Sequence, residues 1–207
     1  MRYGSPMHDL TRPIAATTAA FPGDTPTAVT PVLRMAGGAA INLSTLTCSL
    51  HAATHLDAPW HYDDAGRRID ELDPAALVGP CVIVDARGHD PVPAELIPRD
   101  AERVLIRTGG WPDDATFPTD FPVLSAEAAA KLKGAVLVGV DVPSVDKPDS
   151  KTLPVHHALR EAGVLILEGL TFERLPAGVT GGELIALPLR VAGGDASPVR
   201  AVLREVR

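Results

Sequence analysis

The chain has 207 residues, 45% of them hydrophobic, and a formal net charge of -7. This length and apolar content predict a single domain over residues 1–207 with a substantial core. The acidic balance and the lack of a lysine and arginine cluster argue against nucleic acid as a partner, and no run approaches the roughly 18 apolar residues that cross a membrane.

The N-terminal residues 1–7 have neither an apolar run nor a small-residue cleavage site, so they do not resemble a secretory signal. Cys48 and Cys81 form no CxxC pair and are expected to be buried free thiols. A reducing compartment suits such cysteines. We therefore predict a cytoplasmic protein. The acidic residues are scattered along the chain, which favours a small-molecule substrate or a protein partner over a polyanion.

Residues 51–61 hold His51, His55, Asp57 and His61, in a chain with only seven histidines. On an extended strand His51 and His55 would lie about 13 Å apart, whereas one helical turn would bring their Cβ atoms within roughly 5–6 Å. We therefore predict a helical turn on which both histidines hold one metal ion. Pro59 would end that turn, so Asp57 and His61 are expected in the following loop, Asp57 as a ligand and His61 near the metal. A histidine-rich turn on an ordinary surface is the competing interpretation.

Short β-branched runs bounded by chain-breaking residues predict buried strands through the rest of the chain. A helix is predicted over residues 125–132, with Ser125 as its cap, and another over residues 156–161, before Gly163. The alternation of strand and helix predicts an α/β fold, closed by a half-exposed strand over residues 198–204. The buried strands are predicted over residues 81–85, 103–107, 135–141, 164–168 and 183–188.

A second candidate segment contains the adjacent pair His156 and His157 and then a strand that ends at Glu168. A carboxylate at the C-terminal end of a buried parallel strand is a common position for functional groups in α/β proteins. A solvent-facing charge is the alternative for Glu168. One histidine could bind a metal while the other caps or packs, and the spacing does not choose between them.

The order H-A-A-T-H-L-D-A-P-W-H over residues 51–61 is close to the motif H-x-G-T-H-x-D-x-P-x-H of the cyclase-type metal-dependent hydrolases. Within that family the chain resembles the bacterial kynurenine formamidases, or arylformamidases. Residues 9–14, 21–26, 41–47, 141–146 and 150–152 are also similar, so the resemblance covers nearly the whole chain. It implies a swivelling β/β/α-type mixed sheet with flanking helices, assembled as a homodimer or larger homo-oligomer.

The resemblance implies two divalent metal ions, usually zinc, although manganese and other divalent ions also suit imidazole and carboxylate ligands. His51, His55 and Asp57 would bind one ion, His156 would bind the second, and Asp57 and Glu168 would serve both. The family's histidine lies twelve residues before its glutamate, as His156 does before Glu168, and this selects His156 over its neighbour.

The resemblance also implies that His61 is the acid/base residue and that Phe21 contacts the substrate, where the family commonly has tryptophan. Ala53 replaces the glycine of the motif, Trp60 occupies its variable slot, and Gly169 stands where the family usually has asparagine. The implied reaction is hydrolysis of N-formyl-L-kynurenine to L-kynurenine and formate in tryptophan degradation. Isatin or another cyclic amide is the alternative substrate, since Phe21 and Trp60 could reshape the pocket. A non-catalytic metal-binding protein on the same scaffold is the third interpretation.

Overall fold

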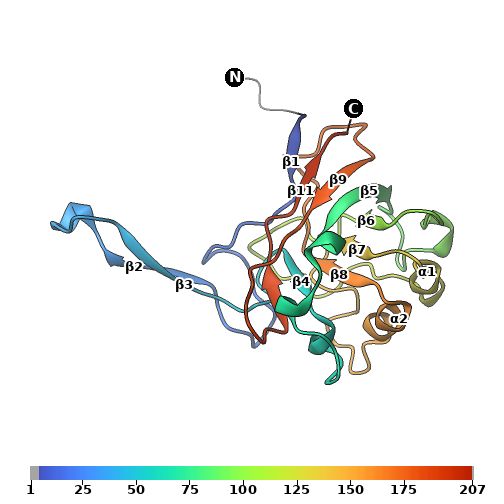
Figure 1. Ribbon diagram of the computed structural model, residues 1–207, viewed down its shortest axis with the longest axis horizontal. Coiled ribbons are helices and arrows are strands. Elements are labelled where there is room, and N and C mark those ends of the chain that lie inside the picture. Colours follow the sequence, from blue (N-terminus) through green and yellow to red (C-terminus); the bar gives the residue numbers. More distant parts are fainter. Residues whose placement is uncertain (1–4, 207) are drawn as a thin grey trace.

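A nine-stranded mixed sheet forms the body of the computed structural model, and a two-stranded hairpin projects from it (Figure 1). The structure describes residues 5–206, so residues 1–4 of the N-terminal segment considered above lie outside the described part. Within residues 5–206, none of the helices combines the length and the apolar character that a membrane crossing requires.

Four parallel strands make the centre of the sheet, and antiparallel strands extend it on both sides. The first strand, β1, pairs with the last, β11, so the two ends of the chain meet at one edge. The opposite edge is formed by β4 and β10. In spatial order the strands are β1 (Met7–Asp9), β11 (Val202–Arg204), β9 (Gly181–Ile185), β5 (Val78–Asp85), β6 (Arg103–Arg107), β7 (Leu137–Val140), β8 (Leu165–Glu168), β4 (His55–Asp57) and β10 (Ala196–Pro198).

Two α-helices cover one face of the sheet. Helix α1 (Ala126–Lys131) begins where the Ser125 hydroxyl accepts a hydrogen bond from the Ala128 amide, as a cap should. Helix α2 (Pro154–Ala162) ends at Gly163, which adopts the left-handed conformation that favours glycine. Both predicted helices are confirmed. Shorter 3-10 turns lie at Met35–Gly37, Pro59–His61, Ile69–Glu71, Pro74–Leu77 and Ala94–Leu96.

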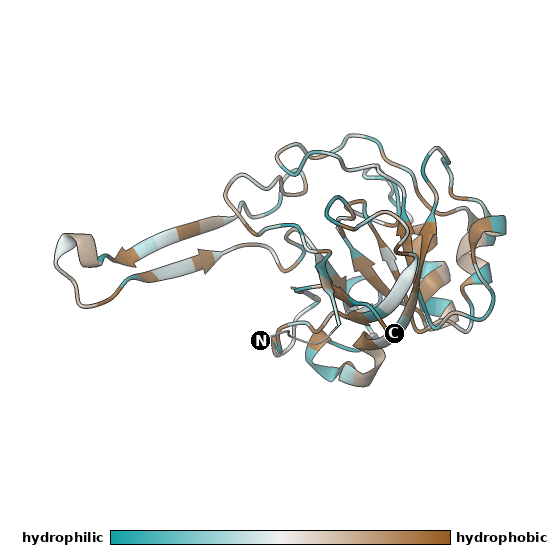
Figure 2. Cartoon of the chain, turned by 90° about the horizontal axis from the view of Figure 1, so that it is seen from above, coloured by the Kyte–Doolittle hydropathy of each residue, from teal (hydrophilic) through white to brown (hydrophobic). Residues whose placement is uncertain are grey.

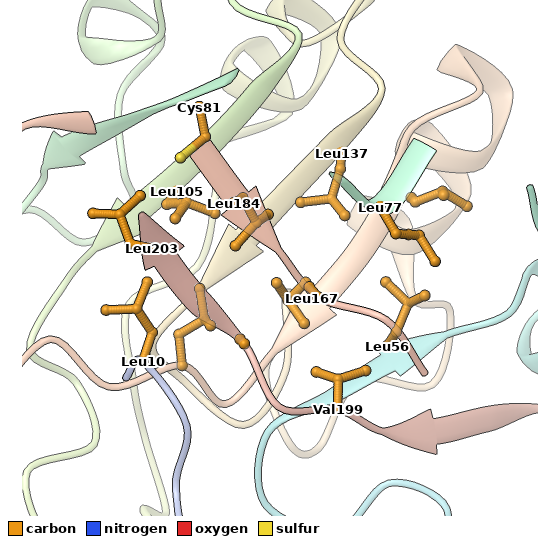
Figure 3. Packing of buried hydrophobic residues seen from close by; sticks show 14 of the residues in the cluster. Leu10, Leu56, Leu77, Cys81, Leu105, Leu137, Leu167, Leu184, Val199 and Leu203 are labelled. Atoms are coloured by element: carbon orange, nitrogen blue, oxygen red, sulfur yellow. The ribbon is translucent and has the colours of Figure 1, made fainter. Parts of the chain in front are cut away.

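Alternate side chains of the central strands point to opposite faces, as the two-residue period of a strand requires. Val104 and Val138 face the helices, whereas Leu105 and Leu137 face the other way. On that second face, side chains from both halves of the sheet join one cluster, which shows that the sheet curls around its own core (Figure 3). The labelled members of that cluster include Leu10, Leu56, Leu105, Leu184 and Leu203.

The predicted buried strands over residues 81–85, 103–107, 135–141, 164–168 and 183–188 correspond to β5, β6, β7, β8 and β9, with boundaries shifted by a few residues. The final predicted strand is shorter than expected and is β11. The mixed sheet and helices agree with the α/β prediction, but the molecule is mostly β because helices are few. Cys48 and Cys81 are free thiols as predicted, although only Cys81 is fully buried.

The projecting hairpin consists of β2 (Ala28–Leu33) and β3 (Leu43–Thr47), and residues 28–47 are called the arm here. Its large apolar side chains are exposed: Val29 is 55% exposed, Met35 59% and Leu46 51%. The only charged residue of the arm is Arg34. Figure 2 shows apolar segments along both strands of the arm, well away from the body.

Candidate metal centre

The end of the sheet where β4 meets β8 brings three ligand-type side chains together. The antiparallel register sets His55 directly opposite Glu168, and the His55 Nε2 atom lies 3.2 Å from Glu168 Oε2. Asp57 follows two residues later, on the same side of β4, and its Oδ1 atom lies 3.5 Å from His55 Nε2. All three residues are buried. Strand pairing alone therefore assembles an imidazole and two carboxylates.

His51 reaches the same point from the turn that precedes β4. Its Nδ1 atom lies 3.1 Å from Asp57 Oδ1, and its ring centroid lies 5.0 Å from that of His55. The prediction of a helical turn here is wrong, because residues 51–54 form an irregular turn and β4 starts at His55. Asp57 is likewise in a strand and not in a loop. The histidines meet because the chain reverses at Ala53, whose φ is +58°.

That reversal is held by two contacts with the end of β8. The Thr54 hydroxyl donates a hydrogen bond of 2.6 Å to the carbonyl of Gly169. Gly169 has a φ of +67°, and a Cβ atom there would lie 2.2 Å from the Ala53 carbonyl oxygen. The sequence alone did not single out Thr54, although it lies inside the motif. Ala53 occupies a left-handed position, which costs an alanine roughly 1–2 kcal/mol.

His156 enters from the first turn of α2. Its Nε2 atom lies 3.6 Å from Asp57 Oδ2 and 3.6 Å from Glu168 Oε1. The next residue, His157, is exposed. The structure therefore brings His156, and not His157, to the carboxylates, as the resemblance implied.

Each of these three histidines has its second ring nitrogen next to an acceptor. His51 Nε2 lies 3.2 Å from Asp195 Oδ2, and His55 Nδ1 lies 3.1 Å from the Ala53 carbonyl. His156 Nδ1 lies 2.7 Å from Asp146 Oδ2. A neutral imidazole that donates from one nitrogen presents a lone pair on the other, which is the arrangement found around metal-binding histidines. No motif in the sequence pointed to Asp195, whereas Asp146 lies in one of the stretches that resemble the formamidases.

The donor set fits a divalent cation, because buried polar atoms at its centre form no hydrogen bond within the protein. Within the described residues, His55 Nε2 and both carboxylate oxygens of Asp57 are buried without a hydrogen bond. Such atoms are costly to bury unless something else satisfies them. Two trios of ligand atoms lie within 4.8 Å of one another, His51 with Asp57 and His61, and His55 with Asp57 and Glu168. Asp57 belongs to both trios, which is the position expected for a shared ligand.

The charges at this centre shift the pKa values of its histidines. Burial lowers the pKa of His55, but Asp57 and Glu168 outweigh it and raise the value to about 10. Burial also lowers the pKa of His156. Hydrogen bonds with Asp146 and Asp57 outweigh this effect and raise the pKa to about 10. Protons on these rings therefore balance the carboxylates where cations would otherwise do so.

His61 differs from the other histidines of the site. It ends the 3-10 turn Pro59–His61, and burial lowers its pKa below the ordinary value. Its ring centroid lies 4.1 Å from that of His51 and 6.2 Å from that of His156. His61 is therefore a neutral imidazole at pH 7 that borders the ligands.

A cavity of about 280 Å³ opens onto these groups. His51, His55, His61 and Glu168 line its inner part, and the aromatic residues Phe21, Trp111 and Phe117 form a wall. Phe21 thus lies where a substrate-contacting residue would be needed. Trp60 does not line the cavity, because its ring packs against Arg68, whose Cζ atom lies 3.2 Å from the ring centroid. The suggestion that Trp60 reshapes the pocket finds no support.

Comparison with known sequences relates most of the chain to one family. The Cyclase family model ("Putative cyclase") matches residues 8–147. The kynurenine formamidase of Maricaulis maris is 42% identical over 208 residues, which cover 97% of this chain and 98% of that protein. The kynurenine formamidase of Bacillus cytotoxicus is 38% identical over 202 residues, which cover 95% of this chain and 96% of that protein.

Solved structures show the same architecture. One described as "predicted metal-dependent hydrolase from Bacillus stearothermophilus" is 26% identical, with a TM-score of 0.80, and the match covers 97% of this chain and 98% of that chain. Isatin hydrolase A from Ralstonia solanacearum is 25% identical, with a TM-score of 0.80, over 97% of this chain and 92% of that chain.

Proposed function

The chain belongs to the Cyclase family, and we propose that it is a metal-dependent arylformamidase that hydrolyses N-formyl-L-kynurenine to L-kynurenine and formate. Full-length relatives at about 40% identity carry that name, since the two compared above are 42% and 38% identical. The observation that carries the proposal is the set of unsatisfied buried atoms on His55 and Asp57, which needs a cation to complete it.

We assign His51, His55 and Asp57 to one ion and His156 to a second, with Asp57 and Glu168 serving both. Asp57 belongs to both ligand trios, which supports its shared role. His156 is assigned to the second ion because its Nε2 atom lies 3.6 Å from Asp57 Oδ2 and 3.6 Å from Glu168 Oε1. Zinc is our first choice, and manganese or another divalent ion suits the same donors. When bound, such ions supply an acidified water near neutral pH and polarise a carbonyl oxygen.

We propose that His61 is the residue that accepts and then returns the proton. Its imidazole is neutral at pH 7 because burial lowers its pKa, so one ring nitrogen can accept a proton from water. The same ring can return the proton to the nitrogen of the aryl amine as the C–N bond breaks. Asp195 Oδ2 lies 3.7 Å from His61 Nδ1 and is placed to favour the protonated ring between those two transfers.

The aromatic wall of the cavity would hold the aryl group of the substrate. Phe21 and Phe117 pack edge to face with centroids 5.4 Å apart, and Trp111 lies 6.2 Å from Phe117. This wall can hold a flat aryl amide whether it is a linear formamide or a cyclic amide. Isatin is therefore the second candidate substrate, and the likeness to isatin hydrolase A also supports it.

We further propose one domain over residues 1–207, of the swivelling β/β/α type, that forms a homodimer through the arm. An isolated two-stranded hairpin is marginally stable in water, and this one exposes Val29, Met35 and Leu46 with a single charge at Arg34. The arm of a second copy offers a matching apolar surface, and a symmetric dimer would bury both arms. The free thiols of the chain suit the reducing cytoplasm.

The test is turnover of N-formyl-L-kynurenine and of isatin by purified protein, before chelation, after it, and after zinc is restored. We expect chelation to abolish release of L-kynurenine and zinc to restore it. His61→Ala should keep its metal and lose roughly 10²–10⁴-fold in kcat, the usual contribution of a positioned acid or base. Metal-loaded protein that opens isatin but leaves the formamide intact would contradict the proposal.

A further inference from the structure

The turn over residues 21–24 joins an aromatic and an acidic side chain at the cavity. The Asp24 amide donates a hydrogen bond of 2.9 Å to the Phe21 carbonyl, and Gly23 at the third position has a φ of +91°. A four-residue turn of this type brings its first and last Cα atoms within about 7 Å. Both Phe21 and Asp24 line the cavity. A ligand ring beside Phe21 therefore has a carboxylate within reach of its substituents.

Asp24 has an acceptor to spare. Its Oδ1 atom accepts a hydrogen bond of 2.6 Å from the Thr25 amide. Among the described residues, no lysine, arginine or histidine forms an ion pair with Asp24. The cavity thus presents a carboxylate whose charge the described part of the chain leaves uncompensated.

Lys147 is the only lysine or arginine among the described residues that line the cavity, and its charge is already engaged. Its Nζ atom donates to Asp90 Oδ2 at 2.9 Å, to Asp120 Oδ1 at 2.6 Å and to the Phe121 carbonyl at 2.7 Å. An ammonium group has three N–H donors, so these acceptors use all of them. The cavity consequently favours a ligand with a positive group over one that is only anionic.

Two hydroxyl groups complete the polar lining. Ser144 Oγ accepts from the Asp146 amide at 3.2 Å, and Ser150 Oγ accepts from the Leu153 amide at 3.1 Å. Each serine keeps its own O–H to donate, because only its oxygen is engaged. A carboxylate beside the ammonium group would therefore still find donors.

We infer that Asp24 binds the α-ammonium group of the substrate, so that the site selects aryl formamides carrying an α-amino acid. This inference rests on the proposed deformylation and defines its substrate class. Isatin has no ammonium group and cannot use Asp24. Asp24 would thus be the residue that separates the two candidate substrates.

The experiment compares two formamides that differ only at the amino-acid end, N-formyl-L-kynurenine and 2-formamidoacetophenone. Asp24→Asn should lower kcat/KM for the first about tenfold or more, the loss expected for a hydrogen bond to a charged group, and leave the second unchanged. Asp24→Glu should recover part of the loss. Asp100→Asn is the matched control, because Asp100 is exposed and lies outside the cavity, and it should change neither rate.

Binding of L-kynurenine and of 2-aminoacetophenone, followed by calorimetry, gives a readout that needs no turnover. Asp24→Asn should weaken binding of L-kynurenine only. Equal effects on both compounds, or no effect on either, would overturn the inference. A wild-type protein that binds L-kynurenine through Asp24 but deformylates neither compound would instead overturn the proposed function alone.

Discussion

The candidate metal centre and the arm place opposite kinds of side chain in opposite environments. At the centre, the ionisable residues His55, Asp57 and Glu168 are buried between strands. Along the arm, the large apolar residues Val29 and Leu46 stand opposite each other across two strands and are half exposed. Each region reverses the usual distribution of polar and apolar groups.

The difference indicates what each region needs. The buried carboxylate of Asp57, whose oxygens accept no hydrogen bond, calls for positive charge, and exposed apolar strands call for another apolar surface. The rest of the sheet has neither requirement, since its two faces are filled by its own leucines, valines and helices. We therefore propose the first region as the place where a metal binds and the second as the place where a second copy of the chain binds.

The largest effect is expected when substitutions at two adjacent histidines are compared. His156→Ala should bind one metal ion fewer than the wild type. Its activity should fall by at least 10–100-fold, because that loss is typical even when only a residue that hydrogen-bonds a metal ligand is removed. His157→Ala should retain both, because His157 is exposed one residue further along the same helix. Metal analysis by mass spectrometry and steady-state rates check this. Equal losses in the two variants would mean that His156 acts only through packing.

The next test concerns the contact that shapes the metal-binding turn. Gly169→Ala combines a φ of +67° with a Cβ atom 2.2 Å from the Ala53 carbonyl, so β4 and β8 must separate. Gly178→Ala has a similar φ of +88° but meets nothing within 4 Å. Gly178→Ala, the control, should lower the free energy of unfolding by roughly 1–2 kcal/mol because of its backbone conformation. Gly169→Ala should lower it by at least twice as much.

Denaturant unfolding measures both glycine variants, and metal content should fall only in Gly169→Ala. Matching losses of stability would show that the turn can relax around an added methyl group.

The pH dependence of folding stability should differ between metal-free and metal-loaded protein. The folded pKa of His55 and of His156, about 10, lies above the ordinary value of 6.5. The stability that these groups contribute is therefore complete below pH 6.5 and is lost as the pH rises towards 10. Metal ions replace these protons, so the loaded protein should not show this loss.

Thermal unfolding from pH 6.5 to 9 tests this prediction. The gap in Tm between the two forms should widen by about 2–4 °C for each kcal/mol that the metal-free form loses. A gap that is constant or narrows with pH would mean that the buried carboxylates are not balanced by histidine protons.

The smallest expected effect on turnover comes from the arm. Leu46→Asp introduces a charge on its exposed apolar face and should convert a dimer into monomers, whereas Leu46→Met should not. Light scattering after size-exclusion chromatography gives the mass of each variant. Activity should change little if each site is complete within one chain. A wild-type monomer would remove the proposed role of the arm.

The buried parallel strands were predictable because strands covered on both faces read as short continuous apolar runs, as in β6 and β8. Strand β4 was missed since its three residues are His55, Leu56 and Asp57, which carry no such run. Its conformation is set by pairing with β8 and β10, which local sequence does not reveal. The arm was missed for a similar reason, because its residues pack against no core.

The residues that meet at the candidate metal centre could be predicted, but the backbone geometry that brings them together could not. Helical spacing seemed necessary to join His51 and His55, yet a left-handed residue at Ala53 achieves the same approach. An alanine in the sequence gives no sign that its φ is positive, whereas a glycine would. Asp195 was equally hidden, since it comes from a loop 144 residues after His51.

The order in which the strands join has a consequence for biosynthesis. β11 lies between β1 and β9, and β10 pairs with β4 through Pro198 and His55. Neither edge of the sheet can close until the segment that holds β10 and β11 has left the ribosome. Long-range pairing of this kind is slow and leaves strand edges open in the meantime. All the proposed ligand residues, up to Glu168, therefore leave the ribosome before either edge of the sheet can close.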